Sequence, residues 1–477
     1  MEPGKIVSAL ISMLGEKQVI WDREQLYPYA MDYCTGNLIH PLAVVKPVDV
    51  NGVSNVVRFC NQIGQKITTR AGGSSVSGGA TSHENGIILS VEGLSSILEI
   101  NEIDGFVIAE SGVITQDLQN RLEEKGLWFP QNISSASMSC IGGNVAVSSG
   151  SPKSLKYGTT KNSVLNLEVV LPNGDVIWTG KNVRKNATGY NLTQLFVGSE
   201  GTLGIITKVV LEIRPLLKEA LLMVPFDNEN SLFQFVKCFF ERNYCASSLE
   251  FLDRNACVLM SNYTNKEIDF GEEMGGIIWI ELESKNDEEN LEKAEHLYHL
   301  IDEFSDFEVF LAQTKQDIAS LWDFRKRIGK AALSYSNFTD LDVVVPRSTI
   351  ETMYANIKKI CTSQNLEFIV IGHIGDGNFH INIFRPKSLD DRQWENTISD
   401  CSQAIFKTAI DLGGEISGEH GIGKIHCDSF LSFSDPNRYD LMRRIKLALD
   451  PNLILNPNTI FDEGPLINKM RRKTIQA

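Results

Sequence analysis

The stretch that most restricts how this chain can fold is rich in glycine and serine. Residues 69–80 read Thr-Arg-Ala-Gly-Gly-Ser-Ser-Val-Ser-Gly-Gly-Ala. Its four glycines allow tight turns that expose successive backbone N–H groups, and its serines add hydroxyl donors. Such a nest binds phosphate oxygens, although a loop of this kind alone is more often a plain connector. The spacing matches neither the NTPase phosphate loop nor the Rossmann fingerprint, so both of those folds are excluded for this segment.

Three further segments of the sequence also contain glycine and support a ligand-binding role for this loop. They are Pro130 with residues 141–146 (Ile-Gly-Gly-Asn-Val-Ala), residues 185–192 (Lys-Asn-Ala-Thr-Gly-Tyr-Asn-Leu) and residues 197–207 (Val-Gly-Ser-Glu-Gly-Thr-Leu-Gly-Ile-Ile-Thr). In each of them glycine lets the backbone approach a flat ligand closely. Together with the loop at 69–80 they predict a long dinucleotide held between two β-rich lobes.

Composition excludes several classes of protein. The 477 residues are 42% hydrophobic and 22% charged, which is ordinary for a globular chain of two or three domains. A net charge of −15 disfavours nucleic acid as a partner. The longest apolar runs, such as residues 276–280, are too short to span a bilayer, so no transmembrane helix is expected. Nine scattered cysteines without a C-x-x-C pair, behind an N-terminus that lacks a signal-peptide pattern, predict a cytoplasmic protein without an iron–sulfur cluster.

Hydrophobic periodicity predicts an α+β chain in five parts. These parts are a helical lead-in (1–39), a glycine-rich β domain (40–216), a second α+β domain (217–410), a C-terminal segment (411–466) and a basic tail (467–477). Predicted helices cover 4–14, 48–63, 287–301, 400–412 and 436–451, and predicted strands cover 86–90, 105–109, 164–171, 277–282, 367–371 and 378–383. Residues 171–175 (Leu-Pro-Asn-Gly-Asp) predict a hairpin turn with positive φ at both central residues.

Two short glycine-rich segments contain a cluster of histidines and acids. Residues 372–380 read Gly-His-Ile-Gly-Asp-Gly-Asn-Phe-His, and residues 417–423 read Ser-Gly-Glu-His-Gly-Ile-Gly. A strand, a glycine-rich turn and a second strand could bring His373 and His380 together. With Glu419 they would make three ligands of a catalytic metal site, with zinc as the first choice and manganese or iron fitting nearly as well. The other histidines are interpreted as ordinary core or loop residues: His40, His83, His296, His299 and His426.

The segment around Trp322 and Arg325 adds a cation to these candidates. The Trp-x-x-Arg spacing places both side chains on one helical face. The planar guanidinium of arginine suits a carboxylate, which it can bind through two parallel hydrogen bonds. The neighbouring Lys326 and Arg327 are interpreted as solvated residues.

Taken together, these motifs resemble the FAD-binding proteins of the vanillyl-alcohol oxidase/p-cresol methylhydroxylase family, over about residues 40–465. The most similar branch contains the FAD subunit of glycolate oxidase and the D-lactate and D-2-hydroxyglutarate dehydrogenases. The resemblance implies a two-lobed FAD-binding domain of the p-cresol methylhydroxylase (PCMH) type, a substrate domain with an antiparallel sheet, and a helical C-terminal segment. It also implies non-covalent FAD, because the loop at 69–80 has no histidine and His83 lies beyond it. The expected FAD contacts are Arg70, Gly72, Gly73, Ser74, Ser75, Ser77, Gly78, Gly79, Pro130, Ser134, Cys140, Gly142, Gly143, Asn144, Glu200, Gly201, Ile206 and Asn456.

The same resemblance implies a reaction and the residues that perform it. His373, His380 and Glu419 would bind the metal, His420 would act as the base, and Arg325 and Asn382 would hold the substrate. The expected activity is oxidation of D-lactate or glycolate to the 2-oxo acid, with hydride transfer to flavin N5. Residues 130–132 (Pro-Gln-Asn) depart from the usual Asp-Pro pattern of the family.

Three alternatives remain open at this point. A D-2-hydroxyglutarate dehydrogenase would need another cation, for which Lys326 or Arg347 is available. The chain could instead be the FAD subunit of a multi-subunit electron-transfer complex, peripheral to a membrane through its partner. A plain metal-binding module would be colourless. Expected electron acceptors are an electron-transfer flavoprotein, an iron–sulfur subunit or a quinone, and a homo-oligomer is compatible with the sequence.

Overall fold

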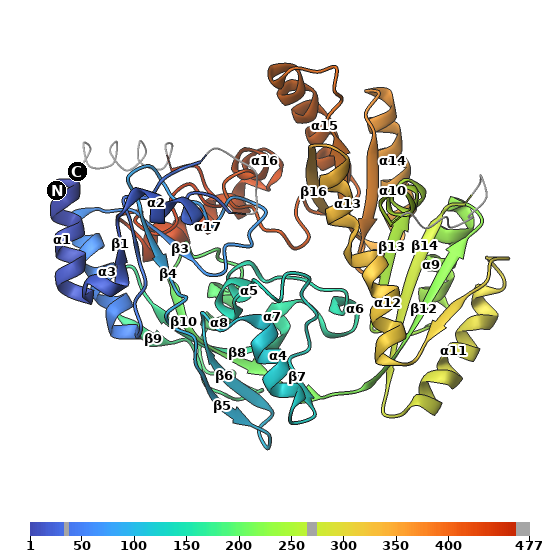
Figure 1. Cartoon of the computed structure of the whole chain (residues 1–477), viewed down its shortest axis with the longest axis horizontal. Helices are drawn as coiled ribbons and strands as arrows, with labels where there is room; N and C mark the ends of the chain where they lie inside the picture. Colours follow the sequence, from blue (N-terminus) through green and yellow to red (C-terminus); the bar gives the residue numbers. More distant parts are fainter. Residues whose placement is uncertain (33–37, 265–273, 464–477) are drawn as a thin grey trace. The chain divides into compact units, whose positions relative to one another are not determined.

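The structure, a computed structural model, describes residues 1–32, 38–264 and 274–463. The chain forms two compact units (Figure 1). The first unit contains residues 1–149, 159–215 and 419–477, and the second contains residues 150–158 and 216–418. The predicted basic tail at 467–477 lies outside the described residues. None of the helices in the described ranges combines the length and the apolarity needed to cross a lipid bilayer.

The first sheet of the first unit is small and mostly parallel. Its strands, in spatial order, are β1 (Val19–Ile20), β2 (Ala43–Val45), β4 (Ile87–Ser90) and β3 (Ile67–Arg70). Helices α1 (Pro3–Leu14) and α3 (Val50–Ile63) share one hydrophobic core with these strands. Both predicted helices are confirmed, and Gly15 ends α1 with a φ of 86°. One face of α3 is apolar and packs into this core, because Val53, Val56, Val57 and Cys60 are buried.

The second sheet of this unit is antiparallel. Its strands, in spatial order, are β5 (Ile97–Asn101), β6 (Phe106–Glu110), β10 (Ile205–Glu212), β8 (Val164–Val170) and β9 (Val176–Trp178). The predicted hairpin between β8 and β9 is present, and Leu171 N donates to Asp175 O at 2.8 Å. The expected backbone of the turn is wrong in one respect, since Gly174 is the only residue of 171–175 with a positive φ. A five-residue loop needs one left-handed position here, not two.

Shorter elements complete the first unit. A two-stranded ribbon pairs β7 (Leu127–Trp128) with β11 (Arg214–Pro215). The remaining α-helices are α2 (Arg23–Leu26), α4 (Thr115–Glu123), α5 (Ile141–Val147), α7 (Thr160–Ser163), α8 (Leu192–Phe196), α16 (Cys427–Phe433) and α17 (Pro436–Leu449). Of these, α4 and α5 contribute Leu118, Leu122, Ile141 and Val145 to the core of the antiparallel sheet.

The C-terminal segment returns to the parallel sheet of the first unit. Leu455 forms a parallel bridge with Ile67 on β3. The buried Lys446 of α17 donates to Asp450 Oδ2 at 2.6 Å, to Thr202 O at 2.8 Å and to Leu455 O at 2.9 Å. All three protons of the ammonium group therefore have acceptors, which makes this buried charge tolerable.

The second unit is built on a seven-stranded antiparallel sheet. Its strands, in spatial order, are β15 (Phe310–Ala312), β12 (Lys218–Phe226), β14 (Gly276–Ser284), β13 (Ser248–Asp253), β17 (Phe368–Gly372), β18 (Asn378–Phe384) and β16 (Phe338–Val344). The predicted α+β class with an antiparallel sheet is confirmed, and the predicted strand at 277–282 lies within β14. Every residue of β14 is buried, as expected for a strand covered on both faces.

Helices surround this sheet. They are α6 (Ser154–Tyr157), α9 (Glu229–Glu241), α10 (Arg254–Thr264), α11 (Asp287–Ile301), α12 (Lys315–Lys326), α13 (Ile328–Tyr335), α14 (Ile350–Ser363) and α15 (Asp391–Asp411). The core around Trp279 includes side chains of α10, α12 and α13. The predicted helix at 287–301 matches α11. The predicted helix at 400–412 is too short, because Asp390 and Gln393 form a capping box that starts α15 nine residues earlier.

Asp253 is a buried carboxyl group at the end of β13. Its Oδ1 accepts a hydrogen bond from Ala256 N at 2.8 Å. Its Oδ2 has no hydrogen-bond partner among the residues that the structure describes. Burial raises the pKa of this group to about 7. The folded protein therefore binds a proton here more tightly than the unfolded chain does.

We expect the free energy of unfolding to fall as the pH rises from about 4 to 7, by up to about 4 kcal/mol from Asp253 alone. An Asp253→Asn variant keeps the acceptor for Ala256 and cannot ionise, so it should show a flatter dependence on pH. Urea unfolding at several pH values tests this, with the exposed Asp287→Asn as the control. An unchanged slope in Asp253→Asn would contradict the prediction.

Candidate functional site

The loop at 69–80 follows β3 in the first unit and leaves a run of backbone donors unused. Within the described part of the chain, the N–H groups of residues 72–76 have no hydrogen-bond acceptor. The loop closes on Ser75, whose Oγ accepts from Ser77 N at 3.2 Å and from Gly79 N at 3.3 Å. Five consecutive unpaired N–H groups on a half-buried loop suit an anionic ligand, as the pyrophosphate of a dinucleotide would be.

Glycine is required in this loop because other backbone segments lie against it. A Cβ on Gly72 would lie 2.0 Å from Met138 O, and a Cβ on Gly143 would lie 3.1 Å from Ala71 Cβ. A Cβ on Gly142 would lie 2.4 Å from Ser111 Cβ. The structure thus brings together the first two glycine-rich segments that the sequence singled out.

We expect a Gly72→Ala variant to lose its dinucleotide ligand, because the new Cβ must push the loop away from the 138–139 backbone. The FAD content of the purified protein, read from its visible absorbance, should fall at least about tenfold, since a contact of 2.0 Å with a backbone atom has no cheap relief. The control is Gly329→Ala, because a Cβ at that position meets nothing within 4 Å. Full FAD content in Gly72→Ala would count against the role of this loop.

Two side chains fasten the loop to its surroundings. The Arg70 guanidinium donates to Met31 O at 2.8 Å, to Ala80 O at 3.1 Å and to Pro28 O at 3.3 Å. Asn456 Oδ1 accepts from Thr69 N at 2.9 Å. These contacts hold both ends of the loop and leave its middle to a ligand.

Glu200 lies in the glycine-rich segment at 197–207 and contacts the glycine-rich segment at 417–423. Its backbone has a φ of 49°, and its carbonyl accepts from Asn456 Nδ2 at 2.8 Å. Its carboxylate accepts from Ile422 N at 2.9 Å and from Gly423 N at 2.7 Å. Burial raises the pKa of Glu200 to about 7. Residues 421–423, which follow Glu419 and His420, therefore attach to the unit that contains the glycine-rich loop.

The other residues that are expected to contact FAD differ in their burial and in their packing partners. Asn144 is buried and donates to Thr115 Oγ1 at 2.7 Å, and the Ile206 side chain lies in the core of the antiparallel sheet. Pro130 and Cys140 are buried, whereas Ser134 is exposed. A Cβ on Gly201 would lie 2.8 Å from Asn456 Nδ2, so this glycine is needed for packing.

In the second unit, the turn between β17 and β18 brings His373 and His380 together. Their ring centroids are 5.4 Å apart and the ring planes are nearly perpendicular, at 86°. The predicted order of strand, glycine-rich turn and strand is confirmed, with the 3-10 helix η4 (Ile374–Asp376) inside the turn. Both histidines are buried.

Each histidine lies next to a carboxylate on a neighbouring strand. His373 Nδ1 is 2.5 Å from Glu250 Oε1 on β13. His380 Nδ1 is 3.7 Å from Asp342 Oδ1, since the register of β16 and β18 pairs these two residues. A carboxylate on the Nδ1 side of an imidazole is typical of metal-binding histidines, which then use Nε2 as the ligand atom.

Asp342 also anchors the segment that leads to Glu419. Its carboxylate accepts from Asn378 Nδ2 at 2.7 Å, from Ser417 Oγ at 2.9 Å and from Gly418 N at 2.9 Å. Glu419 and His420 are the next two residues in the chain, and they begin the last segment of the first unit.

Arg325 on α12 shares the Glu250 carboxylate with His373. Its Nη2 donates to Glu250 Oε2 at 2.9 Å. Its Nε is buried and has no hydrogen-bond partner among the residues that the structure describes. Burial alone would raise the pKa of Glu250, but its interactions with His373 and Arg325 lower the pKa overall. The site therefore keeps an ionised carboxylate between His373 and Arg325. The Nε–H group of Arg325 remains available to a ligand.

The remaining substrate candidates have partners of their own. Asn382 on β18 is buried and donates to Asp340 Oδ1 at 2.8 Å. Arg347 Nε donates to Gly375 O at 2.6 Å, and its guanidinium lies 4.3 Å from the centre of the Phe240 ring. Lys326 is exposed. Arg347 thus stabilises the turn that carries the two histidines.

A second group of buried charges lies on the same sheet, and we call it the Lys153 cluster. Lys153 pairs with Glu219, with Glu281 at 2.8 Å and with Glu283 at 2.6 Å. Trp322 Nε1, on the same helix as Arg325, donates to Glu281 Oε2 at 3.2 Å. The three carboxylates could hold a cation, but the ammonium group of Lys153 already pairs with all three of them.

Sequence reasoning missed Glu250, Asp342 and the Lys153 cluster. The signal for Glu250 and Glu281 was present, because each is a charged residue inside an otherwise apolar strand (Leu249-Glu250-Phe251 and Ile280-Glu281-Leu282). Charged residues are almost never fully buried unless they are paired. Such positions therefore predict buried partners, although they do not identify them.

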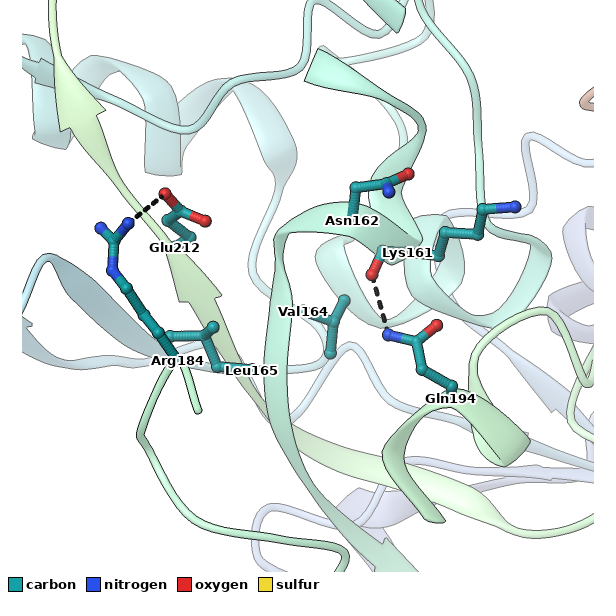
Figure 2. A pocket seen from close by; sticks show the side chains of 7 residues that line it. All are labelled: Lys161, Asn162, Val164, Leu165, Arg184, Gln194 and Glu212. Carbon is teal, nitrogen blue, oxygen red and sulfur yellow. Dashed lines mark hydrogen bonds and ion pairs between the residues drawn. The ribbon is translucent and has the colours of Figure 1, made fainter. Parts of the chain in front are cut away.

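A pocket of about 450 Å³ lies in the first unit, away from the predicted contacts (Figure 2). It is lined by Lys161, Asn162, Val164, Leu165, Arg184, Gln194 and Glu212. Arg184 forms an ion pair with Glu212 at 3.1 Å, and Gln194 Nε2 donates to Lys161 O at 2.9 Å. None of the residues expected to bind FAD, metal or substrate lines this pocket.

Comparisons with known proteins cover most of the chain. Residues 41–180 match the family described as FAD binding domain, and residues 218–460 match the family described as FAD linked oxidases, C-terminal domain. The chain is 34% identical to the glycolate oxidase subunit GlcD of Bacillus subtilis, over 88% of this chain and 89% of the relative. It is 33% identical to a D-lactate dehydrogenase of Archaeoglobus fulgidus, over 87% of this chain and 90% of the relative.

Two further similarities extend over nearly the full length. A D-2-hydroxyglutarate dehydrogenase of Stutzerimonas stutzeri is 28% identical, over 96% of this chain and 98% of the relative. The solved structure of p-cresol methylhydroxylase with substrate bound superposes with a TM-score of 0.78, at 17% identity, over 96% of this chain and 97% of that chain. At this identity the second similarity concerns the fold alone.

Proposed function

The chain belongs to the family of FAD-linked oxidases, and from this membership we propose that it oxidises a 2-hydroxy acid, D-lactate or glycolate, to the 2-oxo acid. Its PCMH-type fold and its FAD-binding domain establish an FAD-linked oxidoreductase. The choice of substrate is supported by the relatives named as a glycolate oxidase subunit and a D-lactate dehydrogenase.

One observation carries the choice of an acidic substrate, and it is the unused donor of Arg325. A buried guanidinium N–H without an acceptor costs free energy unless a ligand supplies one. Arg325 lies beside the histidine pair, since Glu250 contacts both it and His373. A substrate carboxylate on Arg325 would satisfy Nε and would place the adjacent hydroxyl-bearing carbon near the two imidazoles.

The donor set also fits a divalent metal. Two imidazoles with neighbouring carboxylates suit zinc, manganese or iron, and zinc is our first choice. We propose that His373, His380 and Glu419 hold the ion. Chain connectivity supports Glu419 as the third ligand, because the preceding Gly418 is hydrogen-bonded to Asp342, the carboxylate next to His380.

Each bound group would supply one kind of chemistry. FAD supplies a two-electron acceptor for the hydride on C2, and the metal supplies a Lewis acid for the substrate hydroxyl. We propose that Arg325 orients the substrate through its carboxylate and that Asn382 contacts it from β18. His420 would take the hydroxyl proton, a role suited to an imidazole with a pKa near neutrality.

The electrons must then leave the protein. We propose that an electron-transfer flavoprotein, an iron–sulfur subunit or a quinone accepts them. The Bacillus relative is named as a subunit, which supports a partner protein in the case of that relative. The location in the cytoplasm stays a prediction.

D-2-Hydroxyglutarate is the second candidate substrate, because the Stutzerimonas relative matches both chains over nearly their full length. A second carboxylate needs a further cation. Arg347 is engaged with Gly375 and Phe240, which favours the smaller acids over this substrate.

The test is an anaerobic visible spectrum of the purified protein, followed by addition of D-lactate, L-lactate, glycolate and D-2-hydroxyglutarate. We expect a yellow protein that D-lactate or glycolate bleaches, and that a metal chelator protects from bleaching. A yellow protein that no 2-hydroxy acid reduces would overturn the proposed substrate class. A colourless protein that cannot be reconstituted with FAD would leave only a metal-binding role.

A further inference from the structure

The Glu250 side chain contacts both His373, one of the paired histidines, and Arg325 in the second unit. It lies on β13 and is fully buried, with a relative exposure of 0%. Oε1 contacts His373 Nδ1 at 2.5 Å, and Oε2 accepts from Arg325 Nη2 at 2.9 Å. His373 follows β17, which pairs with β13, whereas Arg325 comes from α12.

We propose that Glu250 is a positioning residue that couples the metal site to the substrate-carboxylate site. This inference rests on the proposed function. By accepting a hydrogen bond from the Nδ1–H group of His373, Glu250 fixes the tautomer in which Nε2 is the ligand atom. By holding Nη2 of Arg325, it turns the unused Nε toward the acceptor that a substrate supplies.

The chemistry of the carboxylate makes this double role specific. A glutamate offers acceptors on both oxygens, so it can serve two donors at once. A glutamine of the same shape has one acceptor and one donor, so one of the two contacts would become donor against donor. An aspartate keeps the charge but is one methylene shorter, so it cannot reach both partners in the same geometry.

The molecule also provides a matched control. Glu281 lies on β14, the strand next to β13, and is equally buried, at 1%. It contacts Lys153 and Trp322, and no contact joins it to His373 or Arg325 among the described residues. A Glu281→Gln variant therefore tests loss of a buried carboxylate without loss of the proposed coupling.

The experiment measures two affinities in the FAD-loaded full chain. The first is the affinity for Co²⁺, from its visible absorption bands in competition with a chelator. The second is the affinity for pyruvate in chelator-treated protein, from calorimetry. We expect Glu250→Gln to weaken both, each by about 10- to 100-fold, as is typical of losing a partner of a metal ligand. Glu281→Gln should leave both within about twofold of the wild type.

Other outcomes separate this inference from the proposed function. If the wild type binds Co²⁺ and pyruvate but Glu250→Gln keeps either affinity, the coupling role of Glu250 is wrong and the proposed function stands. If the wild type itself binds no Co²⁺, the proposed metal site is wrong. Glu250→Asp serves as a second variant should Glu250→Gln fold poorly, and wild-type values for both ligands in Glu250→Asp would likewise overturn the inference.

Discussion

Replacing His380 with alanine is expected to leave the protein yellow while slowing reduction of its flavin by the substrate about 1,000-fold. Lewis-acid stabilisation of the developing charge is worth several kcal/mol, and each 1.36 kcal/mol is a factor of ten in rate. The colour should remain because the expected FAD contacts all lie in the first unit, whereas His380 lies on β18 in the second. Stopped-flow measurement of flavin bleaching by D-lactate or glycolate gives the rate.

The control for this variant is His299→Ala, which removes an exposed histidine near the end of α11. It should bleach at the wild-type rate. Addition of chelator should slow the wild type and have little further effect on His380→Ala, because both act on the same ion. Bleaching of His380→Ala at the wild-type rate would mean that the histidine pair does not bind a catalytic metal.

Replacing Lys153 with methionine is expected to lower the free energy of unfolding by about 3–5 kcal/mol. The Lys153 side chain is 3% exposed, and its ammonium group pairs with Glu281 and Glu283, whose side chains are 1% and 2% exposed. Removing one partner of a buried ion pair leaves an uncompensated charge in a low-dielectric environment. Here two carboxylates would be affected, so the loss should be visible as a large drop in the urea midpoint.

Lys156→Met is the matched control for this stability measurement. The Lys156 side chain is 36% exposed and contacts Glu283 at 2.8 Å from the rim of the cluster. A partly exposed pair contributes at most about 1 kcal/mol, so this variant should be only slightly destabilised. The deficit of Lys153→Met should shrink at acidic pH, where Glu281 and Glu283 take up protons in place of the lost cation. A loss below about 1 kcal/mol for Lys153→Met would contradict this account of the cluster.

Local patterns predicted the secondary structure best where one residue type controls the backbone. The predicted end of the first helix at residue 14 is correct because Gly15 stops α1, and the helical spacing of apolar residues placed α3 correctly. The start of α15 was predicted nine residues late, because a polar first half hid a capping box that Asp390 and Gln393 already encode. The prediction of a positive φ for Asn173 was wrong. The pairing of β8 with β9 sets the length of the loop, and the loop length decides the turn type.

For the candidate site, spacing was enough to predict that His373 and His380 converge, since a strand, a turn and a strand are local in sequence. The partners of these histidines are not local. Glu250 is separated from His373 by 123 residues and from Arg325 by 75, and only the pairing of β13 with β17 and the packing of α12 bring them together.

The amino-acid sequence by itself determined the glycine-rich nest and the histidine turn, because each depends on residues that are close in the chain. The set of motifs along the whole sequence determined the family to which the chain belongs. The tertiary structure alone decided which carboxylates hold His373, His380 and Arg325, and that Lys153 is buried among three acids. Those contacts depend on strand order and on which face of each strand is covered. A buried charge can be recognised from a linear pattern, but its partner is selected by the three-dimensional packing that excludes water from both.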